Sequence, residues 1–345
     1  MLFFLSAVLQ FKCTYPFEIE PTASISQSIA WSEGFKRYVL SDGKELGMHY
    51  YEAGMNGPLP VKDKKNQLNT KHASGRRSIL FIGCRVWTFP TDFDARDVLK
   101  IYSNYDDVRV QNLDRSKLTT GQSIRTSALP LGLDLHSLEQ KSMYGLNQTQ
   151  WQKQLDDITN IRQHSKALID RIPRILVTWA RNKSTSARHR KSGYLMRSTL
   201  YDEARSSPLF EFSLGKRIHQ WTEMSKFAFV FSPIGNGFDC HRFWEAIVLG
   251  CIVIVQKNPT ANEFSDCFPV IQVENIKSIT TDNLLEWHSK FRNSTPLWKV
   301  SILNWLGPEP NQPASCGPNA TASALKAWSQ SGVRLTVEKR EDSET

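Results

Sequence analysis

Cysteine is sparse in this sequence, and its six cysteines lie far apart. They form no C-x-x-C pair, and no histidine stands at zinc-ligand spacing, which excludes a zinc finger and a dense disulfide framework. Long apolar runs are also missing. The opening MLFFLSAVLQF is apolar for only about ten residues, too short to span a membrane, and it lacks the basic start of a signal peptide. It is either a weak or truncated signal, with at most a weak membrane association, or a first strand.

Several phosphate-binding motifs are absent. The chain has no G-x-G-x-x-G fingerprint, no P-loop ending in GK[ST], and no recognisable nucleic-acid module, so no nucleic-acid partner is predicted. One D-x-D triplet occurs at Asp92-Phe93-Asp94. It lacks the α/β context that a metal-binding triplet needs, so neither a metal nor another cofactor is predicted.

Positive charge is concentrated in one segment. The formal net charge is +9, and the segment 171–217 has eleven Arg or Lys residues against three acidic ones, a net charge of +8. This excess predicts an anionic partner, which on charge alone is a nucleic acid, a membrane surface, a phosphorylated substrate or an acidic polysaccharide.

The hydrophobic pattern predicts an α/β fold. The second half alternates short apolar strands (RILVTWA, LFEFS, FAFVF, CIVIV, FPVIQV) with helices, and several strands are apolar on both faces, which is typical of a parallel sheet covered on both sides. In the first half, SILFIG, DVRVQN and TSALPLG resemble strands. The expected regions are a poorly patterned segment 1–75, an α/β domain 76–150, a bridging helix 151–172, a second α/β domain 173–305 and a flexible tail 306–345.

The stretch SPIGNGFDCHRFWEAIVLGCIVIV is the most informative one. A strand ends at Ser232, Gly235 and Gly237 permit close approach of the backbone to a ligand, and Asp239 is placed to cap the following helix. Arg242 and Glu245 share one helix face. A guanidinium for a diphosphate and a carboxylate for ribose hydroxyls are what a sugar nucleotide needs; a capped helix with a solvated Arg/Glu pair explains the residues equally well.

This stretch resembles the donor-site motif of exostosin-like glycosyltransferases, with its Ser-Pro-x-Gly-x-Gly loop, then Arg, Glu-Ala and Leu-Gly-Cys. The resemblance implies a GT-B fold with two Rossmann-like domains, the C-terminal one having a parallel sheet with helices on both faces. It implies that 76–150 is the acceptor-side domain and that 173–305 is the nucleotide-sugar-binding domain. It implies that Gly235, Asn236 and Gly237 line the nucleotide site, that Arg242 contacts the diphosphate and that Glu245 binds the ribose. The expected donor-binding residues are Ser232, Gly235, Asn236, Gly237, Asp239, His241, Arg242, Glu245, Arg190 and Arg197.

The catalytic base should come from the acceptor side of the interdomain cleft. Asp134 and His136, in LPLGLDLH, are the candidates, although a turn Asp and a surface His explain them as well. Val253 stands where a second glutamate of many retaining enzymes would lie, which favours inversion.

The expected function is therefore metal-independent transfer of a sugar from a nucleotide-sugar donor to a carbohydrate or glycoprotein acceptor. The Golgi or another secretory lumen is the expected location in a eukaryote, and the cytoplasm otherwise. Sequons at Asn147, Asn182, Asn293 and Asn319 are compatible with a lumen. The alternative is a catalytically silent protein that retains the donor lobe and binds polyanions or nucleotides.

Overall fold

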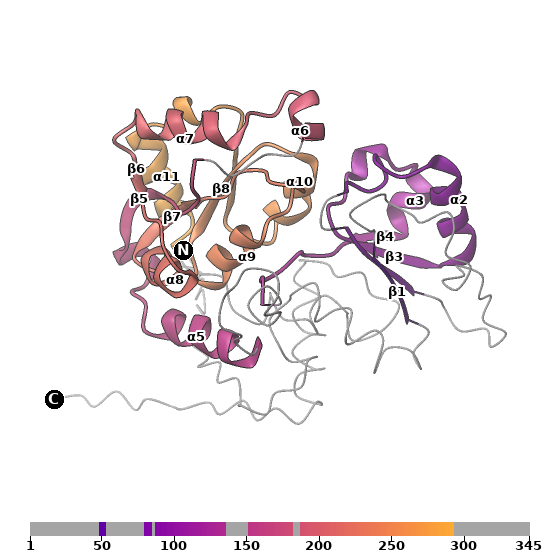
Figure 1. The fold of residues 1–345 in the computed structure, drawn as a ribbon, viewed down its shortest axis with the longest axis horizontal. Helices are drawn as coiled ribbons and strands as arrows, with labels where there is room; N and C mark the ends of the chain where they lie inside the picture. Colours follow the sequence, from indigo (N-terminus) through magenta and orange to yellow (C-terminus); the bar gives the residue numbers. More distant parts are fainter. Residues whose placement is uncertain (1–47, 53–78, 85–86, 136–150, 182–186, 293–345) are drawn as a thin grey trace, which may run out of the picture.

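The protein forms two lobes, each built on a parallel β-sheet with helices against it (Figure 1). The computed structural model describes residues 48–52, 79–84, 87–135, 151–181 and 187–292. His136 and the four sequons lie outside the described residues.

The first lobe has a sheet whose strands are paired in chain order. Its strands are β1 (Met48–Glu52), β2 (Ile79–Gly83), β3 (Asp107–Val110) and β4 (Thr126–Ala128). The helix α2 (Ala95–Asn104) connects β2 to β3, and α3 (Thr120–Ile124) precedes β4. SILFIG, DVRVQN and TSALPLG are therefore strands, as predicted. The strand β1 and the helix α2 were not predicted: β1 (MHYYE) has polar residues at both ends of its aromatic pair in place of an apolar run, and α2 includes three charged residues, Arg96, Asp97 and Lys100.

The second lobe has five parallel strands in the order β6-β5-β7-β8-β9. These strands are β5 (Ile172–Val177), β6 (Phe210–Phe212), β7 (Phe227–Phe231), β8 (Ile252–Gln256) and β9 (Val270–Val273). Every residue of β7 and β8 is buried, as a parallel sheet covered on both faces requires. The predicted α/β class and the predicted strands of this half are confirmed.

Helices join these strands and cover both faces of the sheet. They are α6 (Ala187–Lys191), α7 (Arg197–Arg205), α8 (Arg217–Met224), α9 (His241–Val248), α10 (Pro259–Ser265) and α11 (Thr281–Lys290). The helix α5 (Trp151–Gln163) packs against α8 and α9. It is shorter than the predicted 151–172, because the chain turns at Ser165 and a 3-10 turn precedes β5.

The strand order defines a topological switch point in the second lobe. The chain leaves β5 to one side to form β6, then returns to the other side of β5 to form β7. Connections that diverge from two adjacent strands leave a crevice outside their carboxyl ends, which is where open α/β sheets bind ligands. The switch point therefore lies between residue 178, after β5, and residue 232, after β7.

One hydrophobic core extends through both lobes. It includes Phe81 and Val110 of the first sheet together with Trp221, Trp244 and Val253 of the second lobe, all buried. A second core covers the other face of the second sheet. Trp221 and Trp244, on α8 and α9, are core residues.

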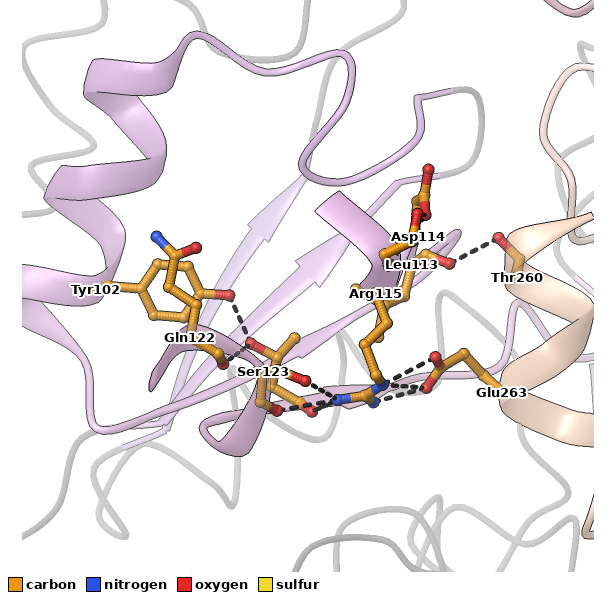
Figure 2. A network of polar contacts seen from close by, with 10 residues as sticks. Tyr102, Leu113, Asp114, Arg115, Gln122, Ser123, Thr260 and Glu263 are labelled. Carbon is orange, nitrogen blue, oxygen red and sulfur yellow. Dashed lines mark hydrogen bonds and ion pairs between the residues drawn. The ribbon is translucent and has the colours of Figure 1, made fainter. Parts of the chain in front are cut away.

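An ion pair joins the lobes at α10 (Figure 2). Arg115, after β3, donates through Nε and Nη2 to the carboxylate of Glu263 on α10 at 2.6 to 3.0 Å. Its Nη1 donates to the carbonyls of Ser123 and Thr126 at 2.9 Å. Beside this pair, the Thr260 hydroxyl donates to the Leu113 carbonyl at 3.0 Å. The residues that follow β3 therefore contact the crossover between β8 and β9.

Candidate functional site

The loop from Ser232 to Cys240 connects β7 to α9 at the switch point. Most of it is buried, but Asn236 is exposed between its two glycines. The N–H of Gly235 donates to the Gly237 carbonyl at 3.1 Å, which folds the loop back on itself. Asn236 therefore lies at the tip of a compact turn that presents its amide to solvent.

The side chain of Arg197, the first residue of α7, occupies the space that a Cβ at position 235 would need. Its Nε donates to the Ile234 carbonyl at 3.1 Å and its Nη2 to the Pro233 carbonyl at 3.2 Å. A Cβ at position 235 would lie 2.7 Å from that Nη2. The glycine was expected to admit a ligand, but in this structure it admits the guanidinium of Arg197. Arg197 thus positions the loop.

Arg242 connects α9 to the carboxyl end of β5. Its Nε donates to the hydroxyl of Thr178 at 2.6 Å, and Thr178 is the residue that follows β5. Burial lowers the pKa of Arg242 and the nearby Arg197 lowers it further, whereas Glu245 raises it. Two guanidinium groups are therefore held close together at the switch point, which favours the binding of an anion.

Glu245 provides an acidic group one helical turn after Arg242. The side chain is 7% exposed, and its carboxylate accepts no hydrogen bond from any residue that the structure describes. Its oxygens are nevertheless not sealed from solvent. Because this carboxylate keeps contact with solvent and accepts no hydrogen bond from a described residue, it is available to a ligand that brings hydrogen-bond donors of its own.

Asp239 does not cap α9 as predicted. The N-cap is Cys240, which makes no side-chain capping bond, and the helix begins at His241. Asp239 is instead buried, and its carboxylate accepts hydrogen bonds from the backbone N–H of Leu131 at 2.7 Å and from Nε1 of Trp244 at 2.8 Å. Burial raises the pKa of Asp239 to about 7. The Asp239 side chain therefore bonds to the first lobe and does not cap the helix that follows it in the chain.

Two further expected donor-site residues are also used for contacts within the protein. His241 donates through Nδ1 to the Gly132 carbonyl of the first lobe at 2.7 Å. Ser232 is buried, and its N–H donates to the Ile254 carbonyl of β8 at 2.9 Å. Arg190, on α6, is exposed, with Nη1 3.8 Å from the sulfur of Met196. Arg242 and Glu245 gather at the switch point with Arg197 and the loop residues Gly235, Asn236 and Gly237, and Ser232 lies there through its place after β7.

Asp134, a candidate base, lies at the lobe interface. Its carboxylate accepts a hydrogen bond from Nη2 of Arg217 on α8 at 2.8 Å, and Nη1 of Arg217 also contacts the Asp134 carbonyl. The ion pair ties the end of the first lobe to α8. Neither Thr178 nor Arg217 was expected from the sequence. Thr178 follows a predicted strand, but only the order of the strands reveals that it lies beside the loop.

The D-x-D triplet has local structural roles. Asp94 caps α2 by accepting from the N–H of Arg96 at 2.8 Å, and Asp92 accepts from the N–H of Thr88 at 2.7 Å. In the described ranges, no three His, Cys, Asp or Glu side chains gather as metal ligands would. None of the described helices is long and apolar enough to cross a membrane.

Comparison with known proteins adds no relative. No protein-family model matches this chain, and no curated protein is significantly similar to it. The functional conclusion therefore depends on the loop motif and on the geometry described above.

Proposed function

We propose that this chain is an exostosin-like glycosyltransferase of the GT-B type, which transfers a sugar from a nucleotide-sugar donor to a carbohydrate or glycoprotein acceptor without a metal ion. The observation that carries the proposal is the Glu245 carboxylate. It belongs to a largely buried residue but is open to solvent, it has no hydrogen-bond donor in the described part of the chain, and it lies one turn from Arg242 at the switch point. A ribose supplies two adjacent hydroxyl donors for such a group.

The arginines provide the complementary charge. Arg242 is half-buried beside Thr178, and its pKa is lowered first by burial and then by Arg197. A diphosphate between the loop and these guanidinium groups would relieve their mutual repulsion. When the bond to the sugar breaks, the diphosphate leaves with additional negative charge. The two guanidinium groups, which are in place before the reaction, would stabilise that charge.

The contacts between the lobes support the GT-B arrangement. Residues after β3 and β4 contact the loop after β7 and the start of α9, as in the pairs Asn112 with Asp239 and Gly132 with His241. The carboxyl ends of strands from both sheets therefore face a common region. An acceptor held by the first lobe would meet a donor held by the second in that region.

A thermal-shift experiment tests the donor site. The wild-type protein and Glu245→Gln are screened against UDP-, GDP- and CMP-sugars, with the free nucleotides beside them. A ligand at about one hundred times its dissociation constant stabilises a protein by about 2.7 kcal/mol. We expect one nucleotide class to stabilise the wild type and to lose most of its effect in Glu245→Gln.

The matched control is Glu286→Gln, which removes an exposed carboxylate of α11. It should leave the nucleotide effect unchanged. Equal stabilisation of wild type and Glu245→Gln would refute the role of Glu245. No stabilisation by any donor, combined with salt-sensitive binding of heparin, would favour the polyanion-binding alternative.

A further inference from the structure

Three aromatic side chains meet next to the glycine loop. His189 of α6 stacks on Phe238 of the loop, with ring centroids 4.4 Å apart and planes inclined by 23°. Tyr194 meets both rings edge-on, at 5.1 Å from Phe238 and 6.1 Å from His189. We call His189, Tyr194 and Phe238 the aromatic cluster.

The aromatic cluster is attached to the loop but is not sealed in the core. Nδ1 of His189 donates to the Gly235 carbonyl at 3.3 Å, and His189 is buried. Phe238 and Tyr194 are half-buried, so part of each ring is accessible. The exposed amide of Asn236 is two residues from Phe238. Binding sites for small polar ligands commonly combine an accessible aromatic ring with a few polar groups such as an exposed amide.

Carboxylates of two other segments lie near the same cluster. Burial raises the pKa of Tyr194, and the nearby carboxylates of Asp114 and Glu274 raise it further. Asp114 belongs to the first lobe, after β3, whereas Glu274 follows β9 of the second. In Figure 1, α6 lies at the end of the second lobe that is nearer to the first. The helix α6, which carries His189 of the aromatic cluster, is therefore near the first lobe.

The aromatic cluster and Arg242 lie next to different segments around the loop that follows β7. Arg242 contacts Thr178 at the end of β5. Phe238 is instead next in the chain to Asp239, whose backbone N–H donates to the side chain of Asn112 of the first lobe at 2.7 Å. If the ribose is at Glu245 and the diphosphate at the loop, the base extends away from the aromatic cluster and the sugar extends toward it.

We propose that Phe238 and Tyr194 bind the pyranose ring of the acceptor, with the exposed Asn236 hydrogen-bonding one of its hydroxyl groups. This inference rests on the proposed function for the direction in which the donor lies. The C–H face of a pyranose is apolar and packs on an aromatic ring, whereas its hydroxyls point outward to polar groups such as amides. An accessible aromatic ring and an exposed amide are both present here, next to the first lobe.

Saturation-transfer NMR of the full chain tests the inference. The probes are methyl glycosides of glucose, galactose, mannose, xylose, N-acetylglucosamine and glucuronic acid, with uridine, cytidine and guanosine beside them. We expect saturation of the ring C–H protons of at least one glycoside, and affinity about tenfold weaker in Phe238→Leu, which keeps apolar volume but removes the ring. Phe238→Tyr should retain binding, and Asn236→Ala should weaken it.

A matched control is Phe212→Leu, because Phe212 is a half-buried phenylalanine of β6, at the far edge of the sheet. It should leave glycoside binding unchanged. The inference is overturned if no glycoside is saturated, if Phe238→Leu binds as the wild type does, or if only the nucleosides lose binding in Phe238→Leu. The thermal-shift screen separates the two proposals: nucleotide stabilisation without glycoside binding refutes the acceptor site alone, and the reverse result refutes the donor site alone.

Discussion

The carboxylate of Asp239 accepts a hydrogen bond from the backbone N–H of Leu131 at 2.7 Å, across 108 positions of the chain. The backbone N–H of Asp239 in turn donates to the side chain of Asn112 at 2.7 Å. Asn112 is buried and adopts a positive φ of 52°, a conformation that asparagine tolerates better than most residues. One loop residue of the second lobe is thus held by two segments of the first.

The buried Asp239 predicts a particular dependence of stability on pH. Burial raises its pKa from 3.8 to about 7, so between these values the folded protein holds a proton that the unfolded chain has released. The contribution of Asp239 to the free energy of unfolding therefore falls as the pH rises from 4 to 7, by up to about 4 kcal/mol. Urea denaturation at several pH values should show this loss in the wild type relative to Asp239→Asn. Parallel pH profiles for the two proteins would contradict it.

Gly235→Ala should destabilise the protein. A Cβ there would lie 2.7 Å from Nη2 of Arg197 and 3.2 Å from the sulfur of Cys240, so the loop or the guanidinium must move, at a cost of about 1–3 kcal/mol. Thermal denaturation measures the effect. Gly121→Ala is the control, since an added Cβ at this helical position meets nothing within 4 Å, and it should be neutral or stabilising. Adding Arg197→Ala to Gly235→Ala should reduce the penalty; an additive loss would show that Arg197 is not the obstacle.

The ion pair of Arg115 and Glu263 should couple the lobes measurably. The Glu263 side chain is only 12% exposed and receives two guanidinium nitrogens, so a double-mutant cycle with Arg115→Met and Glu263→Gln should give about 1 kcal/mol or more. The exposed pair of Lys257 and Glu274, 61% and 77% exposed, is the comparison and should give less than about 0.5 kcal/mol. Similar coupling in the two cycles would show that the pair between the lobes contributes no more than a surface pair.

Asp134 is either the catalytic base or a structural ion-pair partner between the lobes, and an experiment can distinguish these roles. Its ion pair with Arg217 is mostly buried, at 17% and 20% exposure, so Asp134→Asn and Arg217→Met should each destabilise by about 1–3 kcal/mol. Thermal denaturation provides that comparison, and hydrolysis of the nucleotide sugar provides a second readout. If Asp134→Asn leaves the melting temperature unchanged but abolishes turnover, Asp134 acts as the base and not as a tie between lobes.

The sequence pattern predicted the local structure of the second lobe well, because parallel strands and amphipathic helices alternate there with distinct periods. The end of α9 is also local: Gly250 has a φ of 79°, and the N–H of Cys251 donates to the Ala246 carbonyl at 2.9 Å, which terminates the helix. Contacts between segments far apart in the chain could not be predicted from the periodic pattern of apolar residues. Asp239 looks like a cap in the sequence, and nothing near it in the chain indicates that Leu131 is its partner. The same holds for Arg197, whose position over Gly235 depends on how α7 packs.

The apolar core that includes Phe81 and Trp244 makes the lobes one cooperative unit. Because Trp221 and Val253 share this core with the first sheet, separating the lobes would uncover apolar surface on both. Calorimetry of the whole chain should therefore give a single melting transition, and a fragment that contains the second lobe alone should aggregate. A hinge movement between the lobes would break this shared core, so the lobes should keep their relative position when a substrate binds.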